Sequence, residues 1–144
     1  MYDNEMHISF LGSSKNESFA RMVAGAFASQ LDPTIEQMTD IRTAVSEAVT
    51  NAIIHGYENQ IGLVYMDCYL TGGTFIAHIR DAGKGIEDVD LARQPFYTSR
   101  ANMERSGMGF TMMETFMDAV EVESQLGQGT TVRMTKRIRE ARNA

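Results

Sequence analysis

Two short segments with a two-residue hydrophobic period, residues 63–70 and 74–80, are separated only by Thr-Gly-Gly at positions 71–73. Alternating apolar residues predict half-buried strands, and so short a glycine-rich connection predicts an antiparallel β-hairpin. Cys68 falls in step with the apolar positions of the first strand, so we expect it to be buried. Because the chain has one cysteine, an internal disulfide and a cysteine-based zinc site are excluded.

Other segments predict further strands and a helix. Residues 5–11 alternate between polar and apolar side chains and predict a strand. Residues 119–124 and 131–135 predict a second strand pair joined by a glycine-containing turn, and a helix is expected from about residue 109 to 117. The basic tail at 136–144 is expected to fray.

A first helix is expected after Ser14 and Asn16, which can act as its N-terminal caps. Its apolar side chains recur at helical spacing and form one stripe: Phe19, Met22, Val23, Ala26 and Phe27. We expect this stripe to face the core. Arg21 lies off the stripe and is therefore expected to be exposed.

A second helix is expected to begin with Asp32 as its cap and Pro33 at its first position. Its apolar stripe consists of Ile41, Val45, Ala48 and Ala52. Gly56 is expected to end the helix in the left-handed conformation that glycine favours.

The composition limits the class of protein. With 144 residues, 43% of them apolar, the chain can bury the core of one domain. Its net charge of −6 argues against non-specific nucleic-acid binding, which needs a basic face. No segment reaches the roughly 18 apolar residues that span a bilayer. We therefore expect one soluble, cytoplasmic domain, residues 1–144, without a membrane or nucleic-acid partner.

Glu47 and Asn51 are four residues apart, so they share one face of the second helix, beside its apolar stripe. Mg²⁺ prefers oxygen ligands and keeps several from water and phosphate, and an asparagine can supply one without adding charge. A neighbouring glutamate could then accept a proton from an attacking hydroxyl. For this pair alone, a solvated glutamate and an ordinary helix asparagine are the more common interpretation.

Asp81 ends the second hairpin strand and is followed by Gly83 and Gly85. A carboxylate there can accept a hydrogen bond from the amine of adenine, and the glycines would let the backbone come close to the base. Alone, the motif is more typical of an aspartate in a turn. Thr130, after Gly129, could place a hydroxyl near the adenine or simply belong to a hairpin turn.

Residues 81–106 are polar and longer than an ordinary connection, which is typical of a lid or a binding segment. Gly107 and Gly109 precede the expected helix, so their amides can point at phosphate groups, and Arg100 and Arg105 offer positive charge. Neither a P-loop nor a Rossmann dinucleotide motif is present in the sequence.

In their order along the chain, the motifs at 47–51, 81–85, 107–110 and 127–131 resemble the N, G1, G2 and G3 boxes of the GHKL ATP-binding superfamily. Within this superfamily, the chain most resembles the anti-sigma-factor serine kinases, and above all the sporulation anti-sigma F type. The stretches that carry this resemblance are NEMHISF, NESFARM, QLDPT, SEAVTNAIIHGYEN, RDAGKGI, ARQPFYTS and ERSGMGFTMMETFMD. The resemblance extends to about Lys136.

This resemblance implies a Bergerat-type α/β (α+β) two-layer sandwich, with helices on one face of a mixed, mainly antiparallel sheet. It implies ATP and Mg²⁺ as cofactors. It also implies a homodimer that binds the sporulation sigma factor F and phosphorylates a serine on an anti-anti-sigma protein.

The resemblance also implies roles for single residues. Glu47 would be the catalytic base, Asn51 the Mg²⁺ ligand and Asp81 the adenine-reading carboxylate. The other nucleotide-contacting residues would be Gly83, Gly85, Thr98, Ser99, Arg105, Gly107, Gly109 and Thr130. Arg21 would lie on the surface shared by the sigma factor and the anti-anti-sigma protein.

The lid departs from the type. Where L-F-T-T-K-P-E is expected, residues 96–102 read F-Y-T-S-R-A-N. Ser99 and Arg100 keep a hydroxyl and a charge, whereas the missing proline is expected to loosen the lid. Residues 95–106 are expected to become ordered when a nucleoside triphosphate binds.

Two other functions remain open from the sequence. One is a nucleotide-switched sigma-factor-binding module with little or no kinase activity, which would have no need of a base such as Glu47. The other is the catalytic domain of a histidine kinase, which we expect to be preceded by a dimerisation helix with a phospho-accepting histidine. The larger ATPases of the superfamily need further domains beyond the size of this chain.

Overall fold

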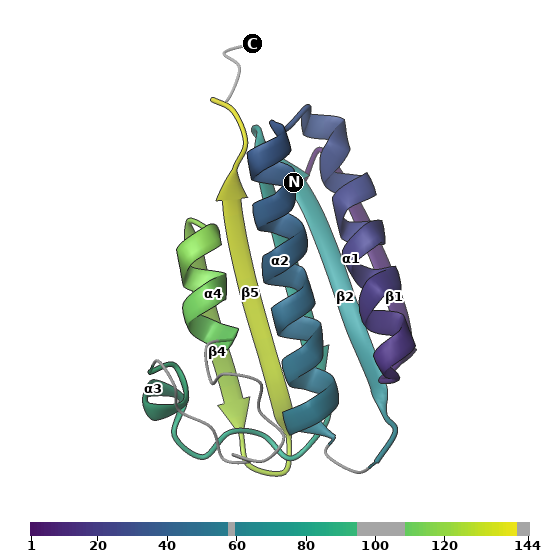
Figure 1. Ribbon diagram of the computed structural model, residues 1–144, viewed down its shortest axis with the longest axis vertical. Coiled ribbons are helices and arrows are strands. Elements are labelled where there is room, and N and C mark those ends of the chain that lie inside the picture. The colour runs from purple at the N-terminus through teal and green to yellow at the C-terminus, as the bar shows by residue number, and fades with distance from the viewer. Residues whose placement is uncertain (58–59, 95–108, 141–144) are drawn as a thin grey trace.

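The computed structural model describes residues 1–57, 60–94 and 109–140. The elements follow one another as β1 (Asn4–Leu11), α1 (Ser14–Ala28), a 3₁₀ turn (Ser29–Leu31), α2 (Ile35–Asn51), a π-helical turn (Ala52–Gly56), β2 (Leu63–Thr71), β3 (Thr74–Asp81), α3 (Val89–Ala92), α4 (Gly109–Phe116), β4 (Ala119–Gln125) and β5 (Gly129–Arg137). Figure 1 shows α1, α2 and α4 lying side by side over the sheet.

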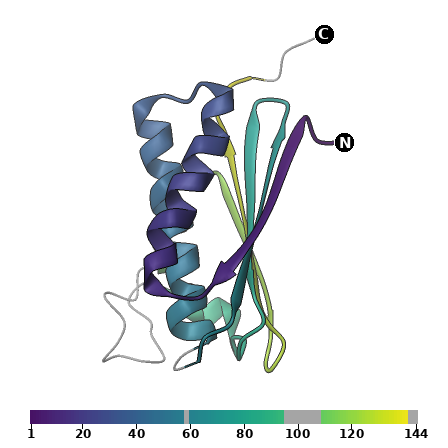
Figure 2. The same ribbon diagram turned by 90° about the vertical axis from the view of Figure 1, so that its right-hand side faces the viewer.

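The strands form a five-stranded sheet in the order β1-β2-β3-β5-β4, and each pairing is antiparallel. The expected hairpin is confirmed: β2 and β3 are joined at Gly72 and Gly73, whose φ angles are 54° and 83°. Positive φ at both turn positions matches the twist of the strands, and glycine adopts it without strain. Figure 2 shows the helices on one face of the sheet only, so the two-layer α/β fold is confirmed.

The core lies between the helices and the covered face of the sheet. Alternate residues of β2 point into it, as the two-residue period predicts. Cys68 is fully buried there, and burial raises the pKa of its thiol to about 12. Within the described ranges, no helix combines the length and the apolar character that crossing a bilayer requires.

The expected apolar stripe of α1 is wrong in part. Phe19 and Met22 are 51% and 64% exposed, and Ala26 is exposed as well. The helix instead buries a row of mostly small residues: Ala20, Ala24, Gly25, Phe27 and Ala28. A Cβ atom on Gly25 would lie 2.8 Å from Arg42 Nε and 3.2 Å from Met38 Sδ of α2, so these two side chains fill the space that a larger residue would need. Close packing therefore outweighs the hydrophobicity of the larger residues.

The caps of both helices differ from those expected. Ser13, one residue before α1, accepts a hydrogen bond from a backbone N–H and is the actual cap. At the start of α2, Thr34 and Gln37 form a reciprocal capping box. Asp32 instead ends the preceding 3₁₀ turn in the left-handed conformation, with a φ of 53°, and Pro33 lies outside the helix.

The apolar stripe of α2 is confirmed, because its four expected members are buried: Ile41, Val45, Ala48 and Ala52. The helical path ends at Gly56, as expected, although through a π-helical turn. Gly56 is not among the glycines with positive φ in the described chain. A Cβ atom there would lie 2.7 Å from the carboxyl carbon of Asp81, so glycine is needed for space and not for a left-handed turn.

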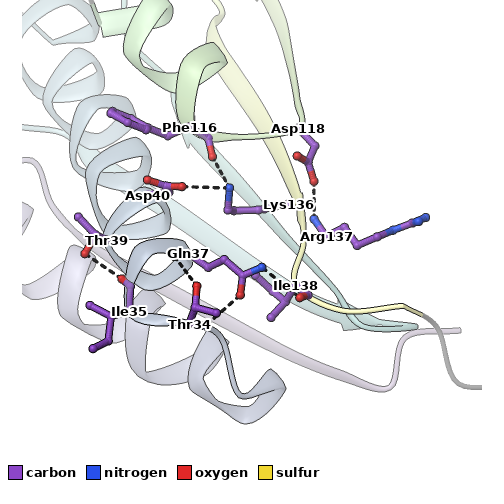
Figure 3. A network of polar contacts seen from close by, with 10 residues as sticks. All are labelled: Thr34, Ile35, Gln37, Thr39, Asp40, Phe116, Asp118, Lys136, Arg137 and Ile138. Atoms are coloured by element: carbon purple, nitrogen blue, oxygen red, sulfur yellow. Dashed lines mark hydrogen bonds and ion pairs between the residues drawn. The ribbon is translucent and has the colours of Figure 1, made fainter.

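Polar contacts connect the end of β5 to both α2 and α4 (Figure 3). Lys136 Nζ lies 3.3 Å from Asp40 Oδ2 and donates a hydrogen bond of 2.6 Å to the carbonyl oxygen of Phe116. Gln37 Nε2 donates to the carbonyl oxygen of Ile138, which is buried. The expected fraying from residue 136 is therefore wrong for 136–138, while 141–144 lie outside the described residues.

These contacts predict that Lys136→Ala destabilises the fold. The lysine side chain is only 12% exposed, and its loss leaves the Asp40 carboxylate and a helix-end carbonyl without this donor. We expect the free energy of unfolding to fall by about 1–3 kcal/mol in urea titrations. Arg137→Ala is the control, because its side chain is 63% exposed and should contribute at most about 1 kcal/mol. Equal effects of the two substitutions would contradict the prediction.

Candidate functional site

A cavity of about 750 Å³ opens where α2 ends, beside the end of β3 and the start of α4. Figure 1 shows these elements converging at one end of the molecule, next to α3. The inner wall of the cavity is apolar and comes from several elements: Ala48, Ala52, Ile79, Ile86, Phe110 and Val132. Two of these residues, Ala48 of α2 and Ala52 of the π-helical turn, are alanines, so small side chains line the cavity on that side. Such a cavity suits a flat, largely apolar group with a few polar edges.

Asp81 is the buried carboxylate of this cavity. It is 6% exposed, and its Oδ1 accepts a hydrogen bond of 2.9 Å from the backbone N–H of Gly83. Burial raises the pKa of Asp81, while hydrogen bonds with the backbone of Gly83 and Thr130 act in the opposite direction. Asp81 also lines the cavity, so its carboxyl group could accept a further hydrogen bond from a ligand there.

The glycines of the D-A-G-K-G motif pack against the protein's own backbone. A Cβ atom on Gly83 would lie 1.9 Å from the carbonyl oxygen of Gly56. Gly85 has a φ of 79°, and a Cβ atom there would lie 2.1 Å from the carbonyl oxygen of Gln125. These glycines therefore bring the segment after β3 against the end of α2 and the β4–β5 turn, which closes the site around Asp81.

Asn51 and Gly109 meet at the other side of the cavity. A Cβ atom on Gly109 would lie 3.1 Å from Asn51 Nδ2, so the first turn of α4 lies directly against the asparagine. Glu47 lies one turn earlier on α2, is half-buried, and is not among the described residues that line the cavity. In the described part of the chain, no group of three or more His, Cys, Asp or Glu side chains could hold a metal ion.

The structure therefore brings together a subset of the expected site residues. Five of them line the one cavity: Asn51, Asp81, Gly85, Gly109 and Thr130. Gly83 does not line the cavity, but its backbone N–H donates a hydrogen bond to the Asp81 carboxylate. The expected lid contacts fall outside the described residues, namely Thr98, Ser99, Arg100, Arg105 and Gly107, as does the whole segment 95–106.

Two supporting residues escape sequence reasoning. Tyr57 Oη accepts a hydrogen bond from the backbone N–H of Ala82 and donates one to the carbonyl oxygen of Leu63, which ties the start of the loop to β2. Ser124 Oγ accepts from the backbone N–H of Ile86 and lies 2.8 Å from Thr130 Oγ1. Both residues act through contacts with other segments of the chain, and the sequence patterns do not predict these contacts.

Arg21 lies away from this cavity, on a groove between α1 and α2. The groove is lined by residues of both helices: Arg21, Met22, Thr39, Arg42, Thr43 and Ser46. Arg21 is half-buried, not exposed as expected, and it donates a hydrogen bond of 3.2 Å to Ser18 Oγ. Because of the small residues beneath α1, the bulky side chains Phe19 and Met22 stand next to this arginine on the surface.

Comparison with known proteins agrees with this geometry. Residues 14–136 match the model of the histidine kinase-like ATPase domain. The anti-sigma F factor of Thermoanaerobacter sp. (strain X514) is 59% identical over 95% of this chain and 96% of its own. Those of Clostridium kluyveri and Anoxybacillus flavithermus are 57% and 56% identical over 94% of this chain and 96% and 93% of theirs.

Two solved structures share the fold at low sequence identity. The RsbU and RsbW domains of Rv1364c from Mycobacterium tuberculosis match with a TM-score of 0.68 at 22% identity, over 96% of this chain and 33% of that one. Full-length ShkA in complex with AMPPNP matches with a TM-score of 0.58 at 18% identity, over 91% of this chain and 31% of that one. The chain belongs to the histidine kinase-like ATPase domain family and, within it, to the anti-sigma F factors.

Proposed function

We propose that the protein is an anti-sigma factor and a serine/threonine protein kinase. It binds and inhibits the sporulation sigma factor F in the cytoplasm, and it uses Mg-ATP to phosphorylate a serine on an anti-anti-sigma protein. Membership of the anti-sigma F family supports the first activity. The observation that carries the second is the apolar cavity with the buried Asp81 carboxyl group at its inner end and Asn51 on its other side.

The cavity fits the adenine base of ATP. The apolar side chains can contact both faces of a planar ring, and Asp81 can accept a hydrogen bond from the adenine amine. Guanine carries a carbonyl oxygen at that position, which would set one acceptor against another. Because Asp81 is buried, two acceptors facing each other there would carry a free-energy cost.

The phosphates would extend from the base towards Asn51 and the first turn of α4. Backbone N–H groups at a helix start favour negative charge, and Gly109 brings that turn against Asn51. Asn51 can supply an oxygen to Mg²⁺ while phosphates and water complete its coordination. The nucleotide supplies the phosphoryl group and part of the metal coordination, and the protein supplies orientation.

Glu47 would act as the general base. Its position one turn before Asn51, on the same helix face, supports this role. The serine oxygen of the partner forms a bond to the γ-phosphorus, the bond between that phosphorus and the β–γ bridging oxygen breaks, and the serine proton passes to the Glu47 carboxylate. ADP is the product. Phosphoryl transfer of this kind depends mainly on positioning and charge neutralisation.

A specific observation favours the alternative of a nucleotide-switched binding module without kinase activity. Glu47 does not line the cavity in the described part of the structure, whereas Asn51 does. A module of this kind would bind nucleotide and sigma factor normally and transfer no phosphate. Kinase activity of the wild-type protein on an anti-anti-sigma partner therefore separates the two functions.

The groove at Arg21 would be the shared partner surface. Two arginines, Arg21 and Arg42, line it together with Met22, and Phe19 stands exposed on the same helix. A surface that combines positive charge with exposed apolar side chains suits partner segments that are both acidic and apolar. We further propose that the protein acts as a homodimer.

Asp81→Asn should reduce the preference for adenine nucleotides. We expect wild-type protein to bind ATP more tightly than GTP, by roughly 1–3 kcal/mol in titration calorimetry, since guanine leaves the carboxylate unpaired. The asparagine amide can donate to the guanine carbonyl, so the difference should shrink. Glu123→Gln on the exposed strand β4 should leave it unchanged. Equal ATP and GTP affinities of the wild type would remove this role of Asp81.

Glu47→Gln and Asn51→Ala should fail at different steps. The first should retain ATP and sigma-factor binding and lose phosphoryl transfer by about 10²–10⁴-fold, measured with labelled ATP and the anti-anti-sigma partner. The second should weaken Mg-ATP binding itself. Glu36→Gln, in the exposed first turn of the same helix, is the control. Wild-type turnover of Glu47→Gln would identify Glu47 as a solvated helix residue.

Arg21→Glu should weaken binding of both protein partners together and leave nucleotide affinity unchanged, because the groove lies apart from the cavity. Pull-down of sigma factor and of anti-anti-sigma protein measures the loss of partner binding, and calorimetry measures the affinity for ADP, which should not change. Arg137→Glu, at an exposed position on β5, is the charge-matched control. Intact binding of both partners would show that Arg21 is an ordinary surface arginine.

A further inference from the structure

The outer wall of the cavity is formed by α3 and its cap. Residues 84–92 all line the cavity, and the last five of them, 88–92, are α3 and its cap. None of the residues of α3 is buried. The preceding segment is fixed to the sheet as far as Ile86, whose backbone N–H donates to Ser124 Oγ at 2.7 Å. Beyond that point, the wall needs a separate attachment.

Arg93, directly after α3, provides this attachment. Its Nε donates a hydrogen bond of 2.8 Å to Glu114 Oε1 on α4, and its Nη2 donates to the same oxygen. Nη2 also donates a hydrogen bond of 2.9 Å to the carbonyl oxygen of Val120 on β4. One guanidinium group thus joins the end of the wall to a helix and to a strand. Arg93 belongs to the stretch ARQPFYTS, but the sequence suggested no role for this arginine.

The free energy of this interaction is small for the stability of the whole fold but large enough to affect the wall. The side chains of Arg93 and Glu114 are 28% and 41% exposed, and ion pairs with such exposure contribute little to global stability. The wall itself has few buried groups, apart from the partly buried Ala92 that packs against the core. A segment of this kind opens locally at low cost, so a modest attachment can decide whether it stays in place.

We propose that Arg93 is a positioning residue for nucleotide binding, which keeps α3 against the cavity through Glu114 and the carbonyl oxygen of Val120. This inference rests on the proposed nucleotide site. The arginine itself does not line the cavity in the described structure, so it acts through the wall. Its effect should fall mainly on the dissociation rate, because an open wall releases a bound ligand.

Arg93→Ala should speed the release of ADP carrying a fluorescent group on its ribose by roughly 5- to 30-fold in stopped-flow displacement. The melting temperature of the nucleotide-free variant should stay within about 2 °C of wild type. Glu114→Gln, which keeps shape and removes charge, should give a smaller increase. Arg137→Ala, which removes another exposed ion pair, should give none. Unchanged release by Arg93→Ala at an unchanged melting temperature would overturn the proposal.

Charge reversal distinguishes a loss of this ion pair from general damage to the fold. Arg93→Glu should release ADP faster than Arg93→Ala, because it places two carboxylates together, and adding Glu114→Arg should restore part of the lost residence time. Without nucleotide, hydrogen exchange of residues 86–94 should be fastest in Arg93→Glu, slower in Arg93→Ala and slowest in the wild type. If wild-type protein bound no ADP, the proposed function would fail, but hydrogen exchange would still test whether Arg93 holds the wall in place. If no variant changed the exchange of residues 86–94, the proposed role of Arg93 would be refuted.

Discussion

The close contact between the end of α2 and the segment after β3 determines the rest of the site. The backbone N–H of Lys84 donates to the carbonyl oxygen of Gly56 at 2.8 Å, and Gly83 has no room for a side chain against the same residue. This contact places the helix that carries Asn51 beside the strand that carries Asp81. Any larger residue at position 56 or 83 would push the two elements apart and open the cavity between them.

The same contact explains how a carboxyl group can be buried in an otherwise apolar place. Asp81 ends a central strand, where its side chain points to the covered face in step with Ile79. Hydrogen bonds with the backbone of Gly83 and Thr130 offset part of the desolvation penalty. Asp81 also lines the cavity, so a ligand that offers a hydrogen-bond donor there would match the carboxyl group, and one that offers an acceptor would not.

Periodicity in the sequence predicts the strands, the β2–β3 hairpin and the buried face of α2, because these depend on side-chain spacing within one segment. It fails for α1. Hydrophobicity alone selects Phe19 and Met22 for the core, whereas the distance between two helices selects alanine and glycine. The ordered motifs bring Asn51, Asp81 and Thr130 to one place, but Tyr57, Ser124 and Arg93 act through contacts between distant segments that no local pattern records.

The arrangement of α1 has a consequence for the colloidal behaviour of the chain. Three of its alanines lie inside whereas Phe19 and Met22 lie outside, so folding itself does not remove these two large side chains from water. They add to the tendency of copies to adhere to one another. The net charge of −6 acts against this by mutual repulsion, which weakens as salt is added. Solubility of the unpartnered protein thus depends on ionic strength more than its compact core would suggest.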